Sequence, residues 1–380
     1  MPVDGPKLLE RLAELPRGRA VLEAPRAGVH LVGGAVRDLA LGRVPREIDL
    51  VVEGDPEPLI AALGGADEAH ERFGTAVVAG IDVVRARGES YAQPGALPDV
   101  RAGSLDEDLQ RRDFTVNAIA VALADGTVRA VEHAGEDLDA SVLRVLHDGS
   151  FRDDPTRLWR LARYAARLGF RPEERTLQLA SEAVADGAPQ TVSGVRMGNE
   201  LRLALLEPDP VSVLVEAAAL GLLPPGFAPV RPDEALALLP DGEGRGDLVL
   251  LAACCAGMDA RALLAWLDHM GFPAHERDLV AASSRFVTGA PLRAAGTPSE
   301  IARAARGAPL EAVALAGGDN ARRWIEELRH VQLHINGDDL LAAGVPQGPE
   351  VGRRLRHALD RVLDGEIEPG REAELAAALE

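Results

Sequence analysis

The sequence predicts an α+β protein in which a small mixed sheet with flanking helices, up to about residue 130, precedes an elongated all-α region. In the N-terminal third, extended apolar runs alternate with short helical runs, as in VHLVG followed by AVRDLALG. Beyond residue 150, segments such as TRLWRLARYAARLGF show helical spacing interrupted by Gly and Pro. With 380 residues, the chain is expected to form roughly two to four structural units.

The first and middle parts of the chain carry two further structural signals. Residues 6–24 are expected to form one opening helix, because their leucines, Leu8, Leu9, Leu12 and Leu15, are spaced for a single face. The stretch from about 224 to 245 is rich in Pro, Gly and Asp and is expected to connect helical subdomains.

The composition disfavours a membrane or secreted protein. No apolar run approaches the roughly 20 residues that cross a bilayer, and the N-terminus lacks the basic start and apolar core of a signal peptide. The cysteines, Cys254 and Cys255, are adjacent, and we expect buried helix residues in a reducing cytoplasm. Because the net charge is −19, any contact with phosphate requires a local cluster of arginines.

Acidic residues follow a glycine turn in the segment HLVGGAVRDLALGRVPREIDLVVEGD. Gly33 and Gly34 lie between a strand and a short helix, where backbone amides can approach phosphate, although such pairs are commonly only turns. Glu47 and Asp49 stand at i and i+2 of a predicted strand and therefore on one face. Asp82 on the next strand can join them, and three such acids suit two-metal phosphoryl transfer. The alternative for any such pair alone is a set of solvated strand-end acids.

Arginines cluster on the predicted helix that follows residue 153. They fall within about a third of its circumference and have no matching acids nearby in the sequence, so an anionic partner would relieve their repulsion. The alternative is a solvated basic face. These residues are Arg157, Arg160, Arg163, Arg167 and Arg171.

Taken together, the motifs GGAVRD, EIDL, RRDFTVNA and DDPTR resemble those of the bacterial CCA-adding enzyme and poly(A) polymerase family, class II of the DNA polymerase β nucleotidyltransferase superfamily. The resemblance implies metal binding by Glu47 and Asp49, with Asp82 as the third catalytic acid and Mg²⁺ as the cofactor. It also implies a nucleotide-binding set made of Gly33, Gly34, Arg37, Asp38, Arg111, Arg112, Asp113, Asn117, Asp154, Arg157, Arg160 and Arg163.

The motif DDPTR gives a physical account of nucleotide choice. Asp154 and Arg157 are three apart and are expected to be adjacent on a helix surface. A carboxylate only accepts hydrogen bonds and a guanidinium only donates them. The pair can therefore satisfy cytosine and adenine, each of which offers an amino donor beside a ring acceptor, and leaves unpaired polar groups against uracil and guanine.

The resemblance implies addition of CMP and AMP from CTP and ATP to the tRNA 3′ end in the cytoplasm. It implies four parts: a nucleotidyltransferase catalytic head at 1–130, a helical neck with base recognition at 131–200, a helical body at 201–320 and a tail at 321–380. The tail resembles the end of longer bacterial members and is expected to contact tRNA, with Arg353, Arg354 and Arg361 facing phosphate.

Three features bear on the alternatives. RFGTAVV at 72–78 resembles the strand pair before the third acid, and residues 85–100 resemble a flexible loop linked with nucleotide switching, which disfavours a CC-only enzyme. Glu47 stands where the family has aspartate, and its extra methylene moves the carboxylate by roughly 1 Å, against a tolerance of about 0.5 Å. A catalytically impaired RNA-binding relative therefore stays open. An A-adding enzyme and a poly(A) polymerase also stay open, because the same Asp–Arg pair accepts both adenine and cytosine.

Overall fold

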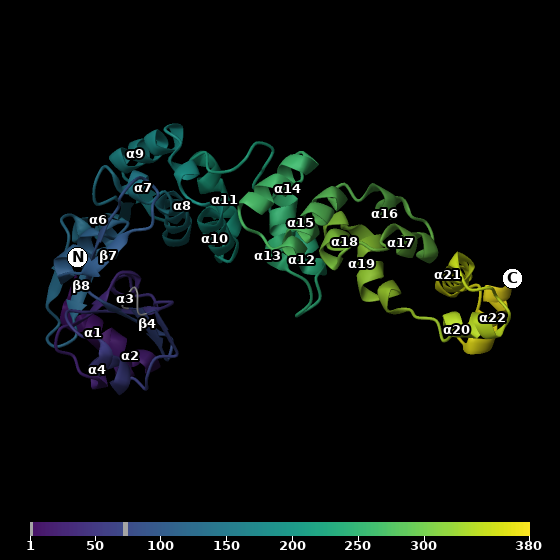
Figure 1. The fold of residues 1–380 in the computed structure, drawn as a ribbon, viewed down its shortest axis with the longest axis horizontal. Helices are drawn as coiled ribbons and strands as arrows, with labels where there is room; N and C mark the ends of the chain where they lie inside the picture. The colour runs from purple at the N-terminus through teal and green to yellow at the C-terminus, as the bar shows by residue number, and fades with distance from the viewer. Residues whose placement is uncertain (1–2, 71–74) are drawn as a thin grey trace. The chain divides into compact units, whose positions relative to one another are not determined.

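The computed structural model describes residues 3–70 and 75–380, which divide after Leu223 into an N-terminal and a C-terminal unit. The predicted fold class is confirmed, because a small mixed sheet lies in the N-terminal unit and helices make up most of the rest (Figure 1). The division into parts 1–130, 131–200, 201–320 and 321–380 stays a prediction. Among the described residues, the structure contains no helix with the length and apolar character needed to cross a membrane.

The opening segment forms two helices, so the prediction of one helix over 6–24 is wrong. α1 (Gly5–Glu14) ends before Leu15, whose backbone is extended, and α2 (Pro16–Glu23) begins at a proline. The residue before a proline is sterically biased away from helical geometry, which explains the break at Leu15. The predicted apolar face of the first helix is present, because Leu8 and Leu12 are buried.

A seven-stranded sheet forms the centre of the N-terminal unit, in the order β3-β4-β5-β2-β1-β8-β9. Its paired neighbours are antiparallel except β2 and β5, which run parallel. Residues 72–74 of the predicted strand pair lie outside the described residues, and residues 75–78 form β4. The strands are β1 (Val29–Val32), β2 (Ile48–Val52), β3 (Glu68–His70), β4 (Thr75–Val78), β5 (Ile81–Arg85), β8 (Ile119–Ala122) and β9 (Val128–Ala130).

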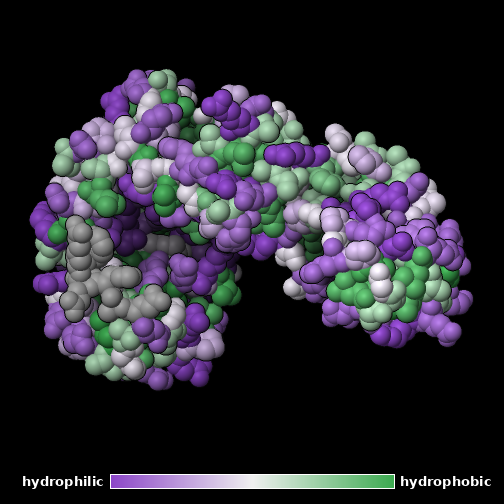
Figure 2. Space-filling view, turned by 45° about the vertical axis from the view of Figure 1, so that its right-hand side comes forward, coloured by the Kyte–Doolittle hydropathy of each residue, from purple (hydrophilic) through white to green (hydrophobic). Residues whose placement is uncertain are grey.

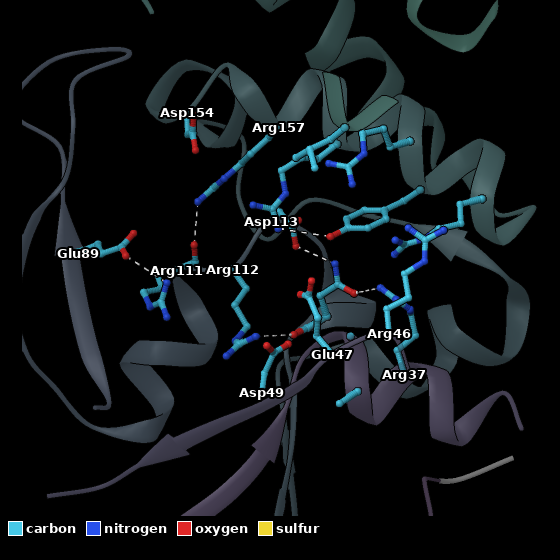
Figure 3. Close-up of a pocket in the computed structure, with 18 of the residues that line it drawn as sticks. Arg37, Arg46, Glu47, Asp49, Glu89, Arg111, Arg112, Asp113, Asp154 and Arg157 are labelled. Atoms are coloured by element: carbon cyan, nitrogen blue, oxygen red, sulfur yellow. Dashed lines mark hydrogen bonds and ion pairs between the residues drawn. The ribbon is translucent and has the colours of Figure 1, made fainter. Parts of the chain in front are cut away.

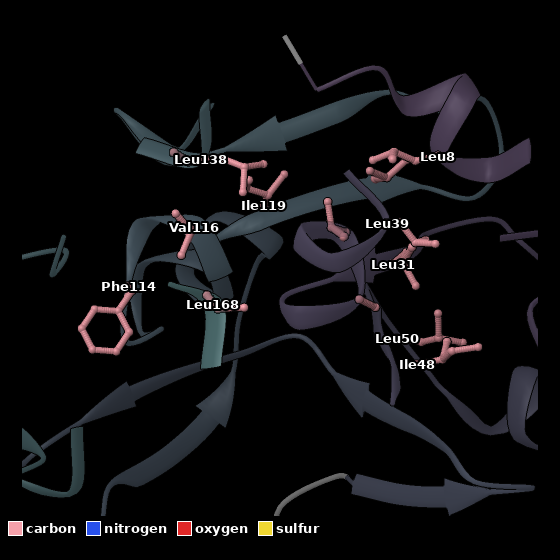
Figure 4. Packing of buried hydrophobic residues seen from close by; sticks show 14 of the residues in the cluster. Leu8, Leu31, Leu39, Ile48, Leu50, Phe114, Val116, Ile119, Leu138 and Leu168 are labelled. Carbon is pink, nitrogen blue, oxygen red and sulfur yellow. The ribbon is translucent and has the colours of Figure 1, made fainter. Parts of the chain in front are cut away.

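The two faces of this sheet bury different residues. On β2, Ile48 and Leu50 belong to a large apolar core, shown in Figure 4. Val51 points the other way and packs with Leu105 and Leu109 of α5 (Leu105–Gln110). Because side chains alternate along a strand, Asp49 shares the face of Val51 and leaves the large core fully apolar.

The segment predicted as a flexible loop is partly regular structure. β6 (Arg87–Ser90) pairs antiparallel with β7 (Asp99–Ala102), so only residues 91–98 connect the two strands. The prediction of a loop over 85–100 is therefore wrong at its ends. Because side chains alternate along a strand, Arg87 and Glu89 of β6 point to the same side of the hairpin. Both residues recur in the site described below.

Helices complete the N-terminal unit and include the predicted arginine-rich helix. That helix, α8, ends at Leu168 before Gly169, which has φ +71°, so Arg171 lies beyond it and its predicted place on the arginine face is wrong. The remaining elements are α3 (Gly34–Ala40), α4 (Glu57–Ala62), η2 (Thr115–Asn117), α6 (Ala134–Ala140), β10 (Val142–Leu143), α7 (Ser150–Asp153), α8 (Thr156–Leu168), β11 (Arg171–Pro172), α9 (Glu174–Ala185), η3 (Ala188–Thr191), α10 (Gly194–Leu205) and α11 (Pro210–Ala219).

The described part of the C-terminal unit is helical. Cys254 and Cys255 are buried and unbridged at the end of α13, as predicted. The predicted connection at 224–245 begins at the boundary of this unit and contains the short helix α12. The elements are α12 (Asp233–Leu238), α13 (Gly246–Cys254), α14 (Ala260–His269), α15 (Ala274–Phe286), α16 (Ala290–Ala294), α17 (Pro298–Ala304), α18 (Leu310–Ala316), α19 (Gly318–Glu326), η4 (Leu328–His330), α20 (Gly337–Ala342), α21 (Pro349–Leu363) and α22 (Arg371–Leu379).

The arginines of the tail pair with acids of the same unit. Arg353 and Arg354 both contact Glu350, and Arg361 contacts Glu366 at 3.2 Å. A phosphate would have to compete with these carboxylates, and the contact between the tail and tRNA stays a prediction.

A buried glutamate holds the last helices together. Glu374 accepts hydrogen bonds from the backbone N–H of Gly370 at 3.0 Å and from the backbone and ring of His334. We expect Glu374→Gln to reduce the free energy of unfolding of this unit by about 1–3 kcal/mol, because charge-assisted bonds are lost in a buried place. Urea denaturation and hydrogen exchange at residues 334 and 370 would measure the loss, and unchanged protection at both amides would contradict it.

Candidate active site

The three predicted acids converge at the edge where β2 and β5 begin. Asp49 and Asp82 are direct partners in the parallel register. Glu47 lies just before β2, in a bend, so it is not a strand residue as predicted. One carboxylate oxygen from each acid nevertheless lies within 4.8 Å of the other two. The structure therefore brings together the acids that the sequence suggested.

The electrostatics of this cluster favour a bound cation. The pKa of Asp49 is raised to about 6, mainly by burial and also by the neighbouring Asp82 and Glu47, although Arg112 acts to lower it. The positively charged groups of the protein thus do not fully neutralise the negative charge of the three ionised acids. Hard divalent cations prefer oxygen ligands such as these, so the donor set fits a metal ion.

The glycine turn lies directly against the acids and Arg112. Gly33 caps the N-terminus of α3 with φ +68°, a conformation that L side chains rarely adopt. A Cβ atom on Gly33 would lie 2.6 Å from Nη1 of Arg112 and 3.7 Å from Oδ2 of Asp49. Because glycine has no side chain, the backbone at residue 33 can lie directly against Arg112 and Asp49.

We expect Gly33→Ala to raise the KM for the nucleoside triphosphate about tenfold or more, because the methyl group displaces Arg112. It should also cost about 1 kcal/mol of stability through the positive φ alone. Gly42→Ala is the matched control, since Gly42 has φ +73° and open space around its Cβ position. Steady-state kinetics with both variants separates the two effects, and equal KM values would contradict the steric role.

The motif RRDFTVNA forms a buried network under the site. Asp113 accepts hydrogen bonds from the backbone N–H of Phe114 at 2.8 Å and from Nδ2 of Asn117 at 2.9 Å, and it pairs with Arg160 at 2.7 Å. Burial alone would raise the pKa of Asp113, but Arg160 and Asn117 outweigh it and the pKa is lowered. Asn117 in turn accepts a bond from the buried Arg37, which links the network to the glycine turn.

The predicted base-reading pair is arranged differently from the expectation. Asp154 lies in extended backbone before α8, not on the helix surface, and its Oδ1 pairs with Arg196 at 3.0 Å. Arg157 is buried and donates to Ser150 Oγ and to the carbonyl oxygen of Arg111, both at 2.7 Å. Each side chain is thus fixed separately, and both face the same pocket.

The arginines of α8 do find acids, contrary to the expectation from the local sequence. Arg163 contacts Glu200 at 2.8 Å and Glu207 at 3.2 Å, and Arg167 contacts Glu207 at 3.6 Å. These acids come from α10 and the turn after it, so the α8 sequence alone gives no sign of them. Tyr164 lies between the arginines, with the guanidinium of Arg167 5.0 Å from its ring centre.

A cavity of about 550 Å³ joins these groups (Figure 3). Figure 2 shows hydrophilic residues inside a hollow of this unit and along part of its rim. Gly33 and Asp82 are not part of the cavity lining but adjoin it, since Gly33 precedes Gly34 and Asp82 pairs with Asp49. The predicted residues that line it are Gly34, Arg37, Asp38, Glu47, Asp49, Arg111, Arg112, Asp113, Asn117, Asp154, Arg157, Arg160 and Arg163.

Sequence reasoning missed further residues of the lining. Glu89 accepts a hydrogen bond from Arg111 at 3.1 Å and one from Tyr91 at 3.2 Å. The alternation of polar residues along β6 is a signal that could have found this side of the hairpin. Arg196 has no such signal. Arg167, which also lines the cavity, belongs to the arginine cluster that the sequence predicted. The missed residues are Ala35, Arg46, Arg87, Glu89, Tyr91, Pro98, Tyr164, Arg196 and Leu203.

The head fold and its acids define a class of nucleotidyltransferase, and residues 29–144 match the family described as Poly A polymerase head domain. A CC-adding tRNA nucleotidyltransferase of Deinococcus radiodurans is 35% identical over 353 residues, covering 88% of this chain and 84% of the relative. The chain therefore belongs to the bacterial CCA-adding family of tRNA nucleotidyltransferases.

Two A-adding tRNA nucleotidyltransferases are also similar. The one from Geobacter sulfurreducens is 34% identical over 91% of this chain, and the one from Halalkalibacterium halodurans is 42% identical over 49% of it. The chain spans less than half the length of these two relatives, 43% and 47% respectively.

Solved structures agree with the fold along the whole chain. The Thermotoga maritima CCA-adding enzyme complexed with tRNA_CCA has a TM-score of 0.76 at 26% identity, covering 99% of both chains. A CCA-adding enzyme complexed with CTP has a TM-score of 0.79 at 25% identity and covers both chains fully, at 100%.

Proposed function

We propose that this chain adds CMP and AMP, from CTP and ATP, to the 3′ end of tRNA without a nucleic-acid template. The observation that carries the proposal is the convergence of Glu47, Asp49 and Asp82 beside a pocket lined by arginines. Relatives named for addition of A, of CC and of CCA, together with similar structures that contain tRNA, CTP or ATP, support it.

Glu47 and Asp49 would hold divalent metal, and we propose Mg²⁺ because the donors are carboxylate oxygens. A bound ion would neutralise charge on the triphosphate and make the ribose hydroxyl of the RNA a better nucleophile. Asp82, the direct partner of Asp49, completes the acidic cluster as the third catalytic residue.

The remaining residues bind and orient the nucleotide. Arg112 lies next to Gly33 and beside the acids, where it can meet triphosphate oxygens with its forked donors. Asp113 and Asn117 hold Arg160 and Arg37 in one network beside the pocket. The full nucleotide-binding set that we propose is Gly33, Gly34, Arg37, Asp38, Arg111, Arg112, Asp113, Asn117, Asp154, Arg157, Arg160 and Arg163.

Base choice would depend on Asp154 and Arg157. Asp154 binds Arg196 and Thr156 through Oδ1, and Oδ2 takes part in none of these bonds. Arg157 is held by the carbonyl oxygen of Arg111 and by Ser150. A fixed acceptor and a fixed donor on one wall match the edges of cytosine and adenine. The two buried, unbridged cysteines are consistent with the reducing cytoplasm, where we place this activity.

The test is incorporation of labelled nucleotides by the purified chain with Mg²⁺ and a tRNA lacking its 3′ CCA. Addition of CMP and then AMP supports the proposal. Addition of AMP only, and only to tRNA that ends in CC, would mean an A-adding enzyme like two of the relatives. RNA binding without any incorporation would mean that Glu47 has impaired the metal site, and Glu47→Asp should then restore activity.

A further inference from the structure

A buried glutamate behind the pocket organises one of its walls. Glu207 lies in the turn between α10 and α11, and its side chain is 1% exposed. It contacts Arg46 at 2.8 Å, Arg163 at 3.2 Å and Arg167 at 3.6 Å. These three arginines line the cavity, whereas Glu207 does not, so the glutamate acts through them.

The three arginines come from two segments that meet only in the folded chain. Arg46 precedes Glu47 in the bend before β2, and its side chain is half-exposed. Arg163 and Arg167 come from α8, the helix that also starts beside Asp154. Glu207 therefore links Arg46, which adjoins the acidic cluster, to α8, the helix that contains Arg157.

This wall is separate from the residues that would read the base. Figure 3 shows Asp154 and Arg157 on one side of the pocket and Arg46 on the other, with Glu47 between them. A reaction that joins a nucleotide to an RNA end needs a place for the nucleotide and a place for the RNA phosphates. Asp154 and Arg157 would bind the base of the nucleotide. The opposite wall, around Arg46, is therefore left for the RNA phosphates.

Positive charge is concentrated on this wall. Burial lowers the pKa of Arg167, and the nearby Arg37 and Arg46 also lower it, whereas Tyr164 and Glu207 act to raise it. Arg46, Arg163 and Arg167 form ion pairs with two acids, Glu200 and Glu207, so three guanidinium groups share two carboxylates. An anion between the arginines would relieve this repulsion, and a phosphodiester matches their forked donors.

We propose that Glu207 is a positioning residue that holds Arg46 and Arg167, beside Arg163 of the nucleotide-binding set, as a binding site for the terminal phosphodiester of the RNA acceptor. This inference rests on the proposed function. The side chain of Glu207 is too buried to touch the RNA itself, and its role is to fix the direction of the flexible side chains of Arg46 and Arg167.

In Glu207→Gln, the direction in which the KM for the tRNA acceptor changes distinguishes loss of positioning from a simple charge effect. Removal of a negative charge by itself strengthens the attraction of RNA, so a charge effect alone would lower the KM for the tRNA acceptor. Loss of positioning should instead raise that KM about tenfold, since charge-assisted bonds fix the arginines. The KM for ATP should change by less than about twofold, because Glu200 still holds Arg163 at 2.8 Å. Glu311→Gln is the control, because Glu311 is equally buried but lies in the C-terminal unit.

Arg46→Gln carries the test if Glu207→Gln fails to fold, because Arg46 is half-exposed. We expect the same rise in acceptor KM, partial recovery in Arg46→Lys, and a double variant with less than the summed effect. An acceptor KM that is unchanged or lowered in both single variants, or an equal rise in both substrates' KM values, overturns the proposal. Failure of the proposed function is distinct, because the unaltered chain would then incorporate no nucleotide or AMP alone.

Discussion

Asp49→Asn is expected to abolish nucleotide incorporation, by roughly a thousandfold or more, and at the same time to stabilise the metal-free protein. The loss follows from removal of the carboxylate at the centre of the acidic cluster, where Asp49 contacts the Asp82 and Glu47 groups. The asparagine has almost the same shape, so RNA affinity should stay within about twofold, because the basic wall is unchanged.

The stabilisation follows from the raised pKa of Asp49. In the folded chain this pKa is about 6, above its ordinary value of 3.8, so the fold disfavours the ionised form. The metal-free protein should therefore lose stability as pH rises from about 4 to about 6. Asp49→Asn should remove this pH dependence and raise Tm at pH 7 by roughly 2–4 °C.

Thermal unfolding in EDTA across pH 4 to 8 measures this effect, and metal titration measures its counterpart. Protons compete with the cation, so apparent Mg²⁺ affinity should fall as pH drops below about 6. The same two measurements on Asp82→Asn compare Asp49 with another acid of the cluster. A Tm for Asp49→Asn below that of the unaltered chain at pH 7 would contradict the electrostatic account.

Asp154→Asn is expected to relax nucleotide choice by about 10- to 100-fold, measured as kcat/KM for CTP and ATP against UTP and GTP. An amide can donate as well as accept, so carbonyl groups of uracil and guanine are no longer left unpaired against an acceptor. The asparagine Oδ1 can keep the bonds from Thr156 and Arg196, which preserves the local fold.

Asp153→Asn provides the matched control, because Asp153 adjoins Asp154 in sequence but does not line the cavity. Its side chain is 39% exposed and contacts His147 at 3.9 Å. Full exclusion of UTP and GTP by Asp154→Asn would show that the carboxylate does not read the base.

The sequence predicted the acidic cluster because strand alternation and family motifs pointed to the same residues. It did not predict that Glu47 lies outside β2, since the start of a strand depends on pairing with distant segments. The break at Pro16 was predictable from the residue itself, because a proline disfavours helical geometry at the position before it.

Partners distant in the sequence explain most of what was missed. Arg196 contacts Asp154 and also donates to the carbonyl oxygen of Gly95 in the β6–β7 connection at 3.1 Å. Nothing in the local pattern of these three segments indicates that they meet. Glu207 was missed for the same reason, since an isolated glutamate after a helix looks like a solvated residue.

The direct pairing of Asp49 with Asp82 limits which insertions and deletions this chain can accept. A one-residue slip in β2 or β5 would turn a carboxylate toward the apolar side of the sheet, among residues such as Leu50 and Val83. Changes of length should therefore be excluded from these two strands and tolerated in the largely exposed connection at residues 53–56, between β2 and α4.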